Sequence, residues 1–208
     1  MILNKVDLKF FIEQDKLMNG RVCLSTTEKI KFFFVPDEKI KFLRYLRKTE
    51  YYHNCSKSNV SIRLNRLILY YFYRIKLHKL GIRLGYSIPI NVVDSGLSLP
   101  HVGTIVISPK AHIGKNCRLH VGVNIGASGG NDEAPLIGDN VYIGPGAILF
   151  GDIKIANNVT IGANATVNKS CEKQNVVFAG TPAKIVKENY PSWVVFNKIC
   201  DAGVSTLD

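Results

Sequence analysis

The sequence has few cysteines, and none of them lies at a spacing that is typical of a metal site. The five are widely scattered, without any C-x-x-C pair: Cys23, Cys55, Cys117, Cys171 and Cys200. An odd number at such distances predicts reduced thiols and argues against a disulfide framework or a cysteine zinc site. Cys117 falls on a repeat position described below, so we expect it in the core.

Long apolar runs are also absent. The longest covers residues 67–73 and lies between Arg66 and Arg74, whereas a membrane span needs about 20 apolar residues. The sequence does not start with a basic segment followed by an apolar one, the pattern typical of a secretion signal. We therefore expect a cytoplasmic protein.

Acidic residues are scarce in the first part of the chain. Residues 1–84 hold 18 Lys and Arg but 7 Asp and Glu, whereas residues 85–208 hold 9 of each, so the net charge of +11 belongs to the first part. A basic half is typical of proteins that meet nucleic acid, anionic membranes or acidic substrates. No nucleic-acid motif accompanies it, so two interpretations stay open: solvated helix faces, or a functional basic surface, for example toward the cytoplasmic membrane.

Apolar residues recur at helical spacing in three segments of this basic part. The segments cover residues 3–18, 36–53 and 59–80, and Gly81 and Gly85 are expected to end the third. The stretch between the first two is less regular. These helices predict a domain over residues 1–84 that caps a trimer, binds the acceptor, or only covers the open end of the domain that follows.

From about residue 90 the sequence repeats every six residues. The repeating aliphatic positions are Ile113, Leu119, Ile125, Ile137, Ile143, Leu149, Ile155, Ile161 and Val167. Three such faces complete a triangular coil of about 18 residues, which predicts a parallel β-helix of about four coils over residues 90–172. The alternative is an ordinary β-sandwich. Its aliphatic positions would not keep a constant spacing of six residues from one strand to the next.

One stretch interrupts the repeat. Twelve residues separate Ile125 from Ile137, and residues 126–133 include no aliphatic side chain larger than alanine. Because insertions in solenoids form loops on one face, often the binding face, we expect this loop to protrude toward a neighbouring subunit.

Two histidines follow repeat positions closely enough to point outward from the coils. His101 and His120 are expected to be neighbours on adjacent coils. Imidazole titrates near neutral pH, so such a pair beside a loop is a candidate for acid and base chemistry on a hydroxyl group. His112, His53 and His78 are weaker candidates because they lie at a corner or on helices.

These features resemble the hexapeptide-repeat acyltransferases, most of all their serine acetyltransferase branch. The resemblance covers about residues 85–188 and includes HVGTIVI at 101–107, VNIGA at 123–127 and AGTPAK at 179–184. Residues 7–16 and 42–52 are similar to a subgroup encoded with capsule and O-antigen enzymes. The resemblance implies a mainly β protein with a left-handed β-helix at 85–188, a tail at 189–208, and a homotrimer with active sites between subunits.

The resemblance also implies roles for individual residues. His101 would be the general base that deprotonates an acceptor hydroxyl, which then attacks acetyl-CoA directly, with His120 and Asp94 as further catalytic candidates. The backbone amides of Gly126 and Ala127 would stabilise the oxyanion. The expected cofactor-binding residues are Gly126, Ala127, Pro145, Ala163, Thr181 and Lys184, the expected acceptor-binding residues are Asn124 and Glu133, and no metal is expected.

The chain departs from the serine enzymes in the acceptor pocket. Those enzymes have a carboxylate directly before the catalytic histidine and an Arg-His pair before a loop proline, where this chain has Pro100 and Glu133-Ala134. A further supporting Asp aligns near Tyr86. Glu in place of Arg would repel the carboxylate of serine, so the acidic partner of His101, Asp94 or Glu133, stays open.

We therefore predict an acetyl-CoA-dependent O-acetyltransferase that acts on a sugar hydroxyl of a surface polysaccharide or its precursor. The carbohydrate acceptor and a homotrimer are the expected partners, with possible contact between the basic half and the cytoplasmic membrane, and no nucleic acid. The first alternative is a serine O-acetyltransferase with a diverged acceptor pocket. A zinc hydro-lyase that uses His101, His112 and His120 and a scaffold without enzymatic activity are the others.

Overall fold

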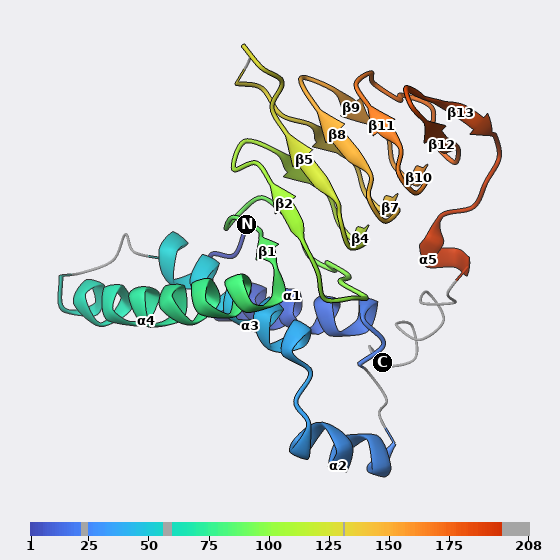
Figure 1. Ribbon diagram of the computed structural model, residues 1–208. Coiled ribbons are helices and arrows are strands. Elements are labelled where there is room, and N and C mark those ends of the chain that lie inside the picture. Colours follow the sequence, from blue (N-terminus) through green and yellow to red (C-terminus); the bar gives the residue numbers. More distant parts are fainter. Residues whose placement is uncertain (22–24, 56–59, 131, 197–208) are drawn as a thin grey trace.

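The computed structural model describes residues 1–21, 25–55, 60–130 and 132–196. Four helices come first: α1 (Lys5–Met18), α2 (Thr26–Phe34), α3 (Glu38–Asn54) and α4 (Val60–Leu84). Figure 1 shows α1, α3 and α4 forming a layer, with α2 set apart on one side of it and the strands rising from the other side. The helical layer thus covers one end of the β structure.

The helices expected at residues 3–18 and 36–53 are confirmed as α1 and α3. Asn4 caps α1 by accepting hydrogen bonds from the amides of Val6 and Asp7, and the Asp7 side chain bonds back to the amide of Asn4. Asp37 caps α3 through the amide of Lys39. These polar caps satisfy amides that have no partner inside the helix.

Two expectations about the helices are wrong. Gly81 does not end the third predicted helix, because α4 continues to Leu84. A side chain at 81 would approach the carbonyl oxygen of Tyr86 to 2.8 Å, so this glycine permits close packing inside the helix. The less regular stretch between the first two predicted helices contains α2. This helix has nine residues, which are too few for its apolar residues to show a clear helical period.

Short strands build the rest of the described chain. They are β1 (Tyr86–Ser87), β2 (Ile105–Ile107), β3 (His112–Ile113), β4 (Arg118–Leu119), β5 (Asn124–Gly126), β6 (Leu136–Ile137), β7 (Tyr142–Ile143), β8 (Ile148–Phe150), β9 (Lys154–Ile155), β10 (Thr160–Ile161), β11 (Thr166–Val167), β12 (Val177–Gly180) and β13 (Ala183–Lys187). Apart from the antiparallel pair β12 and β13, all ladders are parallel. The strand orders are β1-β2-β5-β8-β11, β13-β12-β10-β7-β4 and β3-β6-β9.

The six-residue repeat stacks in the predicted register. Ile113 pairs with Ile137 and Ile137 with Ile155, and the other two columns follow the same rule. All nine repeat residues are 3% exposed or less, and Cys117 is fully buried among them, as expected. Burial of these columns removes apolar area from water in every coil, which confirms a parallel β-helix.

Asparagines turn several corners of the coils. Asn116, Asn140, Asn158 and Asn164 all have positive φ angles, between 53° and 61°, a region that Asn tolerates better than most residues. The side chain of Asn116 donates to that of Asn140, which donates to Asn158, at 3.2 and 3.0 Å. The ladder ties one corner together from coil to coil.

A buried ion cluster joins the helical layer to the first coil. Arg47 of α3 is fully buried and donates to Asp15 of α1 at 2.8 Å and to Glu50 at 3.0 Å. Its guanidinium also donates to the carbonyl oxygens of Val93 and Asp94. The helices are therefore fixed to residues 93–94 of the coil through one side chain.

The described chain ends with a short helix, α5 (Trp193–Phe196), beside the coils. Trp193 and Val194 pack with Met18 of α1 and against Tyr142 of β7. The tail expected at 189–208 is thus partly ordered against the protein, and its residues 197–208 lie outside the described residues. No helix among the described residues is both long and apolar enough to cross a membrane.

Candidate functional site

Two histidines and a tyrosine line up across successive coils. His101 follows the buried Leu99, and His120 follows the buried Leu119 of β4 in the next coil. The ring centroids of His101 and His120 lie 5.8 Å apart, and those of His120 and Tyr142 lie 4.9 Å apart. The expected proximity of the two histidines is confirmed; their roles stay predictions.

The two imidazoles have different surroundings. His101 is exposed, whereas His120 is partly buried and its Nε2 atom has no hydrogen-bond partner among the described residues. Burial, together with the positive charge of Arg118 and the neighbouring His101, lowers the pKa of His120 to about 4. At neutral pH His120 is therefore uncharged, and an exposed imidazole lies beside it.

The backbone around His101 is held by residues from the helical side of the molecule. The Tyr86 hydroxyl donates to the carbonyl oxygen of His101 at 2.6 Å, and the Lys39 ammonium donates to the carbonyl oxygen of Pro100 at 2.8 Å. Burial, with a smaller contribution from Asp37, raises the pKa of Tyr86 to about 12, so the hydroxyl stays protonated. Tyr86 thus supports the His101 backbone instead of its imidazole.

Sequence reasoning missed the surroundings of His120. Arg118 of β4 lies two residues before His120, its Nε donates to the Ser98 hydroxyl at 3.2 Å, and its guanidinium lies 4.3 Å from the ring centroid of Trp193. The indole Nε1 donates to the carbonyl oxygen of Asn116 at 3.0 Å. The two-residue spacing of Arg118 and His120 was a usable signal, but nothing in the tail indicated that Trp193 returns to this sheet.

Asp94 is not brought to His101. Its carboxylate accepts from the amide of Ser95 at 2.7 Å, and it lines a small cavity of about 200 Å³ together with His112. Arg47 binds its carbonyl oxygen from the helical side. Within the described chain, Asp94 therefore has no contact with the histidine pair, and its catalytic role stays a prediction.

Four of the expected cofactor-binding residues lie toward the far end of the β-helix. Pro145 and Ala163 are exposed, and the amide of Asn164 donates to the Pro145 carbonyl oxygen across adjacent coils. The Thr181 hydroxyl contacts the Asn164 carbonyl oxygen and Thr166 Oγ1, both at 3.3 Å. Lys184 is exposed on β13 and pairs with Ala179 of β12. Pro145 and Thr181 are thus linked through Asn164 from coil to coil.

The remaining candidates lie at a different corner, around the end of β5. Asn124 and Ala127 are exposed, and the Gly126 carbonyl oxygen accepts from the amide of Gly151 on the next coil. The loop that follows extends beyond the neighbouring corners in Figure 1. Glu133 is exposed in this loop. Residue 131 lies outside the described residues.

An ion pair links this loop to the preceding coil. Lys110 and Asp132 approach to 2.7 Å, and the lysine lowers the pKa of the Asp132 carboxyl group. Both side chains are exposed, so the pair contributes little stability. The pair does, however, hold Asp132 of the loop close to Lys110.

The described part of the chain contains no group of three His, Cys, Asp or Glu side chains that could hold a metal ion. The histidine pair instead offers one exposed imidazole, able to take a proton from a hydroxyl group, next to one that is uncharged. A hydroxyl is a poor nucleophile until a base removes its proton. The arrangement suits acyl transfer to an alcohol.

Comparison with known sequences connects this site to a group of transferases. Residues 134–169 match the family described as bacterial transferase hexapeptide (six repeats). The serine acetyltransferase of Mycobacterium tuberculosis (strain ATCC 25618 / H37Rv) is 36% identical over 106 residues, which cover 50% of this chain and 46% of that protein. The serine acetyltransferase of Staphylococcus aureus (strain Mu50 / ATCC 700699) is 35% identical over 135 residues, 64% and 58% of the two chains.

Solved structures agree in fold. The serine acetyltransferase of Brucella abortus strain S19 superposes with a TM-score of 0.63 at 21% identity, over 88% of this chain and 70% of that one. That of Neisseria gonorrhoeae gives 0.63 at 24% identity, over 91% and 70%. The parallel sheets and hexapeptide repeats thus match the left-handed β-helix acyltransferases, with a helical region at the amino-terminal end.

These comparisons contradict the expectation of a polysaccharide acceptor. The similar sequences and structures are named serine acetyltransferases, which favours the alternative kept open above, and nothing in them supports membrane association. The chain spans about half of the length of the relatives it matches. Residues 134–169 match the hexapeptide transferase family, and serine acetyltransferases are among the proteins to which the chain is similar.

Proposed function

We propose that this chain is an acetyl-CoA-dependent O-acetyltransferase whose acceptor is serine, bound in a diverged pocket. The observation that carries the proposal is the exposed imidazole of His101, 5.8 Å from that of His120, on a hexapeptide β-helix. The serine acetyltransferases among the homologues support the acceptor.

In the proposed reaction, His101 takes the proton of the acceptor hydroxyl as the oxygen attacks the thioester carbonyl carbon. The C–O bond forms and the carbonyl π electrons move onto oxygen, which the amides of Gly126 and Ala127 stabilise. When the carbonyl re-forms, the C–S bond breaks and the thiolate takes the proton from His101. The imidazole is then neutral again, and no covalent acyl-enzyme is required.

The neutral state of His120 supports this role for His101. A second imidazolium within 6 Å would oppose protonation of His101 in the transition state. Because the pKa of His120 lies near 4, the pair carries at most one positive charge at neutral pH. The proton removed from the acceptor can therefore reside on His101 without repulsion from its neighbour.

We further infer a homotrimer of β-helices with about four coils each and active sites shared between subunits. The outer face of one sheet supports this inference, because Val106 of β2 and Ile148 of β8 are 38% and 44% exposed on either side of Asn124. An active site between two subunits would also bring Pro145 and Thr181 of one subunit close to Gly126 of the next. The Asp94, Asn124 and Glu133 roles and the cytoplasmic location stay predictions.

The experiment that tests the acceptor is thiol release from acetyl-CoA by the purified chain. We expect release to require L-serine and the product to be O-acetylserine, identified by mass spectrometry. L-alanine, which lacks the hydroxyl, and glycerol, which lacks the amino and carboxylate groups, are the matched controls. Equal release with glycerol and serine, or none with serine, would exclude serine as the acceptor.

A further inference from the structure

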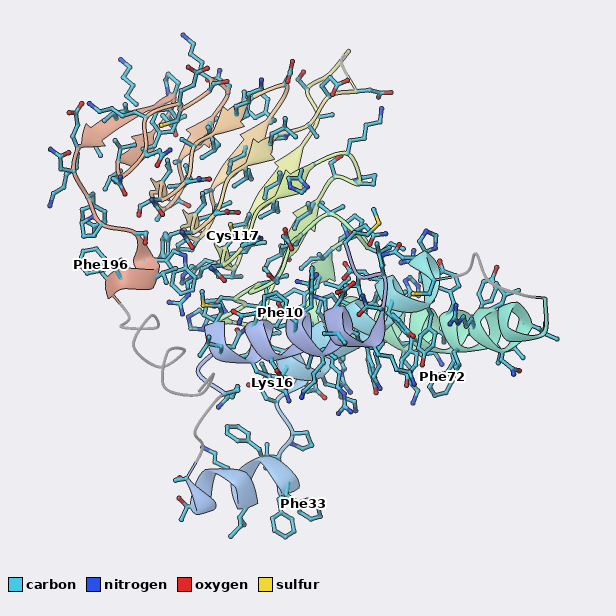
Figure 2. The ribbon with its side chains drawn as sticks, turned by 180° about the vertical axis from the view of Figure 1, so that it is seen from behind. Phe10, Lys16, Phe33, Phe72, Cys117 and Phe196 are labelled. Carbon is cyan, nitrogen blue, oxygen red and sulfur yellow. The ribbon has the colours of Figure 1, made fainter. Side chains whose placement is uncertain are left out.

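A second concave site lies in the helical layer. It is a groove of about 760 Å³ between α1, α3 and α4, with residues around α2 at its rim, and its volume is within the range of ligand-binding pockets. Figure 2 labels two of its residues, Lys16 of α1 and Phe72 of α4, on the side of the layer where α2 lies. None of the candidate residues for acetyl transfer lines it.

The groove is strongly cationic. Six of its thirteen lining residues are Lys or Arg and one is an acid, Asp37. Asp37 is already paired with Arg21, and the other five cations have no ion-pair partner among the described residues. Lys41, Arg44 and Lys48 lie on one face of α3, because they are spaced by three and four residues. Like charges gathered in a concavity repel one another and attract a polyanion.

Aromatic rings lie between these cations. The Lys48 ammonium is 4.7 Å from the ring centroid of Tyr73 and 3.1 Å from its hydroxyl oxygen. The Lys76 ammonium is 4.3 Å from the centroid of Phe72 and 5.9 Å from that of Tyr45. Phe72 is 46% exposed. A ring face attracts a cation, so these contacts hold the charges over the groove, and an exposed ring offers a surface on which a planar ligand stacks.

We propose that this groove binds a free nucleoside polyphosphate. Five cations that have no ion-pair partner in the described part of the chain match a ligand with three or four negative charges better than a monocarboxylate, and Arg44 can bind phosphate oxygens through two parallel N–H groups. The exposed Phe72 ring fits a stacked base. This site is separate from the proposed acetyl-transfer site and does not depend on it.

The test is calorimetric titration of the full chain with ATP, with inorganic triphosphate as a probe that lacks the base. We expect saturable ATP binding with a Kd below about 1 mM, and weaker binding of triphosphate. Replacing Arg44 and Lys48 together by Gln should weaken ATP binding at least about tenfold. Phe72→Leu should weaken binding of ATP more than binding of triphosphate, because the ring both stacks on the base and holds Lys76.

Two further variants keep the test decisive. Lys187→Gln is the matched control, because this lysine also lies over a tyrosine ring, 5.0 Å from the centroid of Tyr190, but outside the groove; its ATP affinity should stay within about twofold of the native value. If the Arg44 and Lys48 variant unfolds, Lys41→Gln with Lys76→Gln replaces it. Unchanged ATP affinity in the groove variants, or association only with phosphatidylglycerol vesicles, would overturn the proposal.

Discussion

The proposed chemistry depends on a contrast between two neighbouring imidazoles. His101 is exposed and its backbone is held by Tyr86 and Lys39, whereas His120 is partly buried and uncharged. These contacts fix the backbone at His101, and its exposed imidazole is accessible to an acceptor hydroxyl. His120 then acts as an uncharged neighbour that shapes the site.

The low pKa of His120 predicts a pH dependence of stability. The folded state binds its proton near pH 4, whereas an unfolded chain binds it near pH 6.5, so unfolding takes up protons between these values. The contribution of His120 to stability is therefore full above about pH 6.5 and is lost as the pH falls toward 4. Urea unfolding should show a smaller loss between pH 7.5 and 5 for His120→Gln than for the native chain.

A parallel comparison separates this effect from the carboxylates that titrate in the same range. His112 is an exposed corner histidine on β3. The His112→Gln variant should keep the native loss of stability between pH 7.5 and 5. If both variants behave like the native chain, His120 does not carry a lowered pKa.

By the resemblance to the serine enzymes, Glu133 occupies the position of an arginine, which predicts weak serine binding. Reversing its charge should favour the serine carboxylate, and because Glu133 is exposed to solvent the gain is screened. We expect Glu133→Arg to lower KM for serine about three- to tenfold with little change in kcat. Glu172→Arg, the same change at an exposed site on the last coil, should leave KM unchanged; equal effects would show a response to net charge alone.

At the scale of elements, the coils owe their regularity to side chains that alternate inward and outward and to corners without bulk. Gly144 directly follows β7, and a Cβ there would lie 2.8 Å from the Ala163 amide nitrogen and 2.9 Å from the Gly162 carbonyl carbon of the next coil. Neither backbone atom can move without shifting the ladder. The glycine therefore sets the distance between two coils.

Substitution of this glycine should destabilise the β-helix. We expect Gly144→Ala to lower the free energy of unfolding by about 1–3 kcal/mol through overpacking, measured by urea denaturation. Gly129 is the control, because a Cβ there meets nothing within 4 Å, so Gly129→Ala should be nearly neutral. Equal stability of the two variants would contradict the close packing of the coils at residue 144.

The sequence predicts the β-helix well because the six-residue repeat follows directly from the way that the coils stack. Each inward residue meets its equivalent one coil away, as Ile143 meets Ile161, so the regular spacing determines the register. The insertion was located for the same reason. The folding back of Trp193 onto β4 depends on long-range packing that leaves no local period, and helix α2 is too short to show a clear one, so neither follows from the sequence.

The site was predictable in part. The neighbouring coils that carry His101 and His120 follow from the six-residue period, but the contact of the Tyr86 hydroxyl with the His101 backbone follows from no pattern. The acceptor was predicted wrongly. The resemblance places Pro100 and Glu133 at positions where the serine enzymes have other residues, but a changed pocket residue indicates only that the pocket differs, and a sugar acceptor does not follow from it.

At the scale of the whole molecule, the helical layer and the β-helix are joined through Arg47. It has two carboxylate partners, Asp15 and Glu50, and all three side chains are almost fully buried. Asp15 also accepts from the amides of Gly96 and Leu97 at 2.9 Å. Through this cluster, the helices position the coil that leads to His101.

Removal of Arg47 should be costly, because it leaves two carboxylates buried without a cation. We expect Arg47→Ala to lower the free energy of unfolding by about 3–5 kcal/mol, measured by urea denaturation. Arg83→Ala removes the exposed pair with Glu38 and should cost no more than about 1 kcal/mol. A small effect at Arg47 would mean that the helical layer is not fixed to the coils by this cluster.

The most direct test of the account is serine-dependent thiol release from acetyl-CoA by the native chain and by His101→Ala, with His112→Ala as the control. The account predicts a rate lower by about 10²–10⁴ for His101→Ala, the usual contribution of a general base, and a native rate for His112→Ala. A fall of less than about tenfold at His101 would contradict its role as the base.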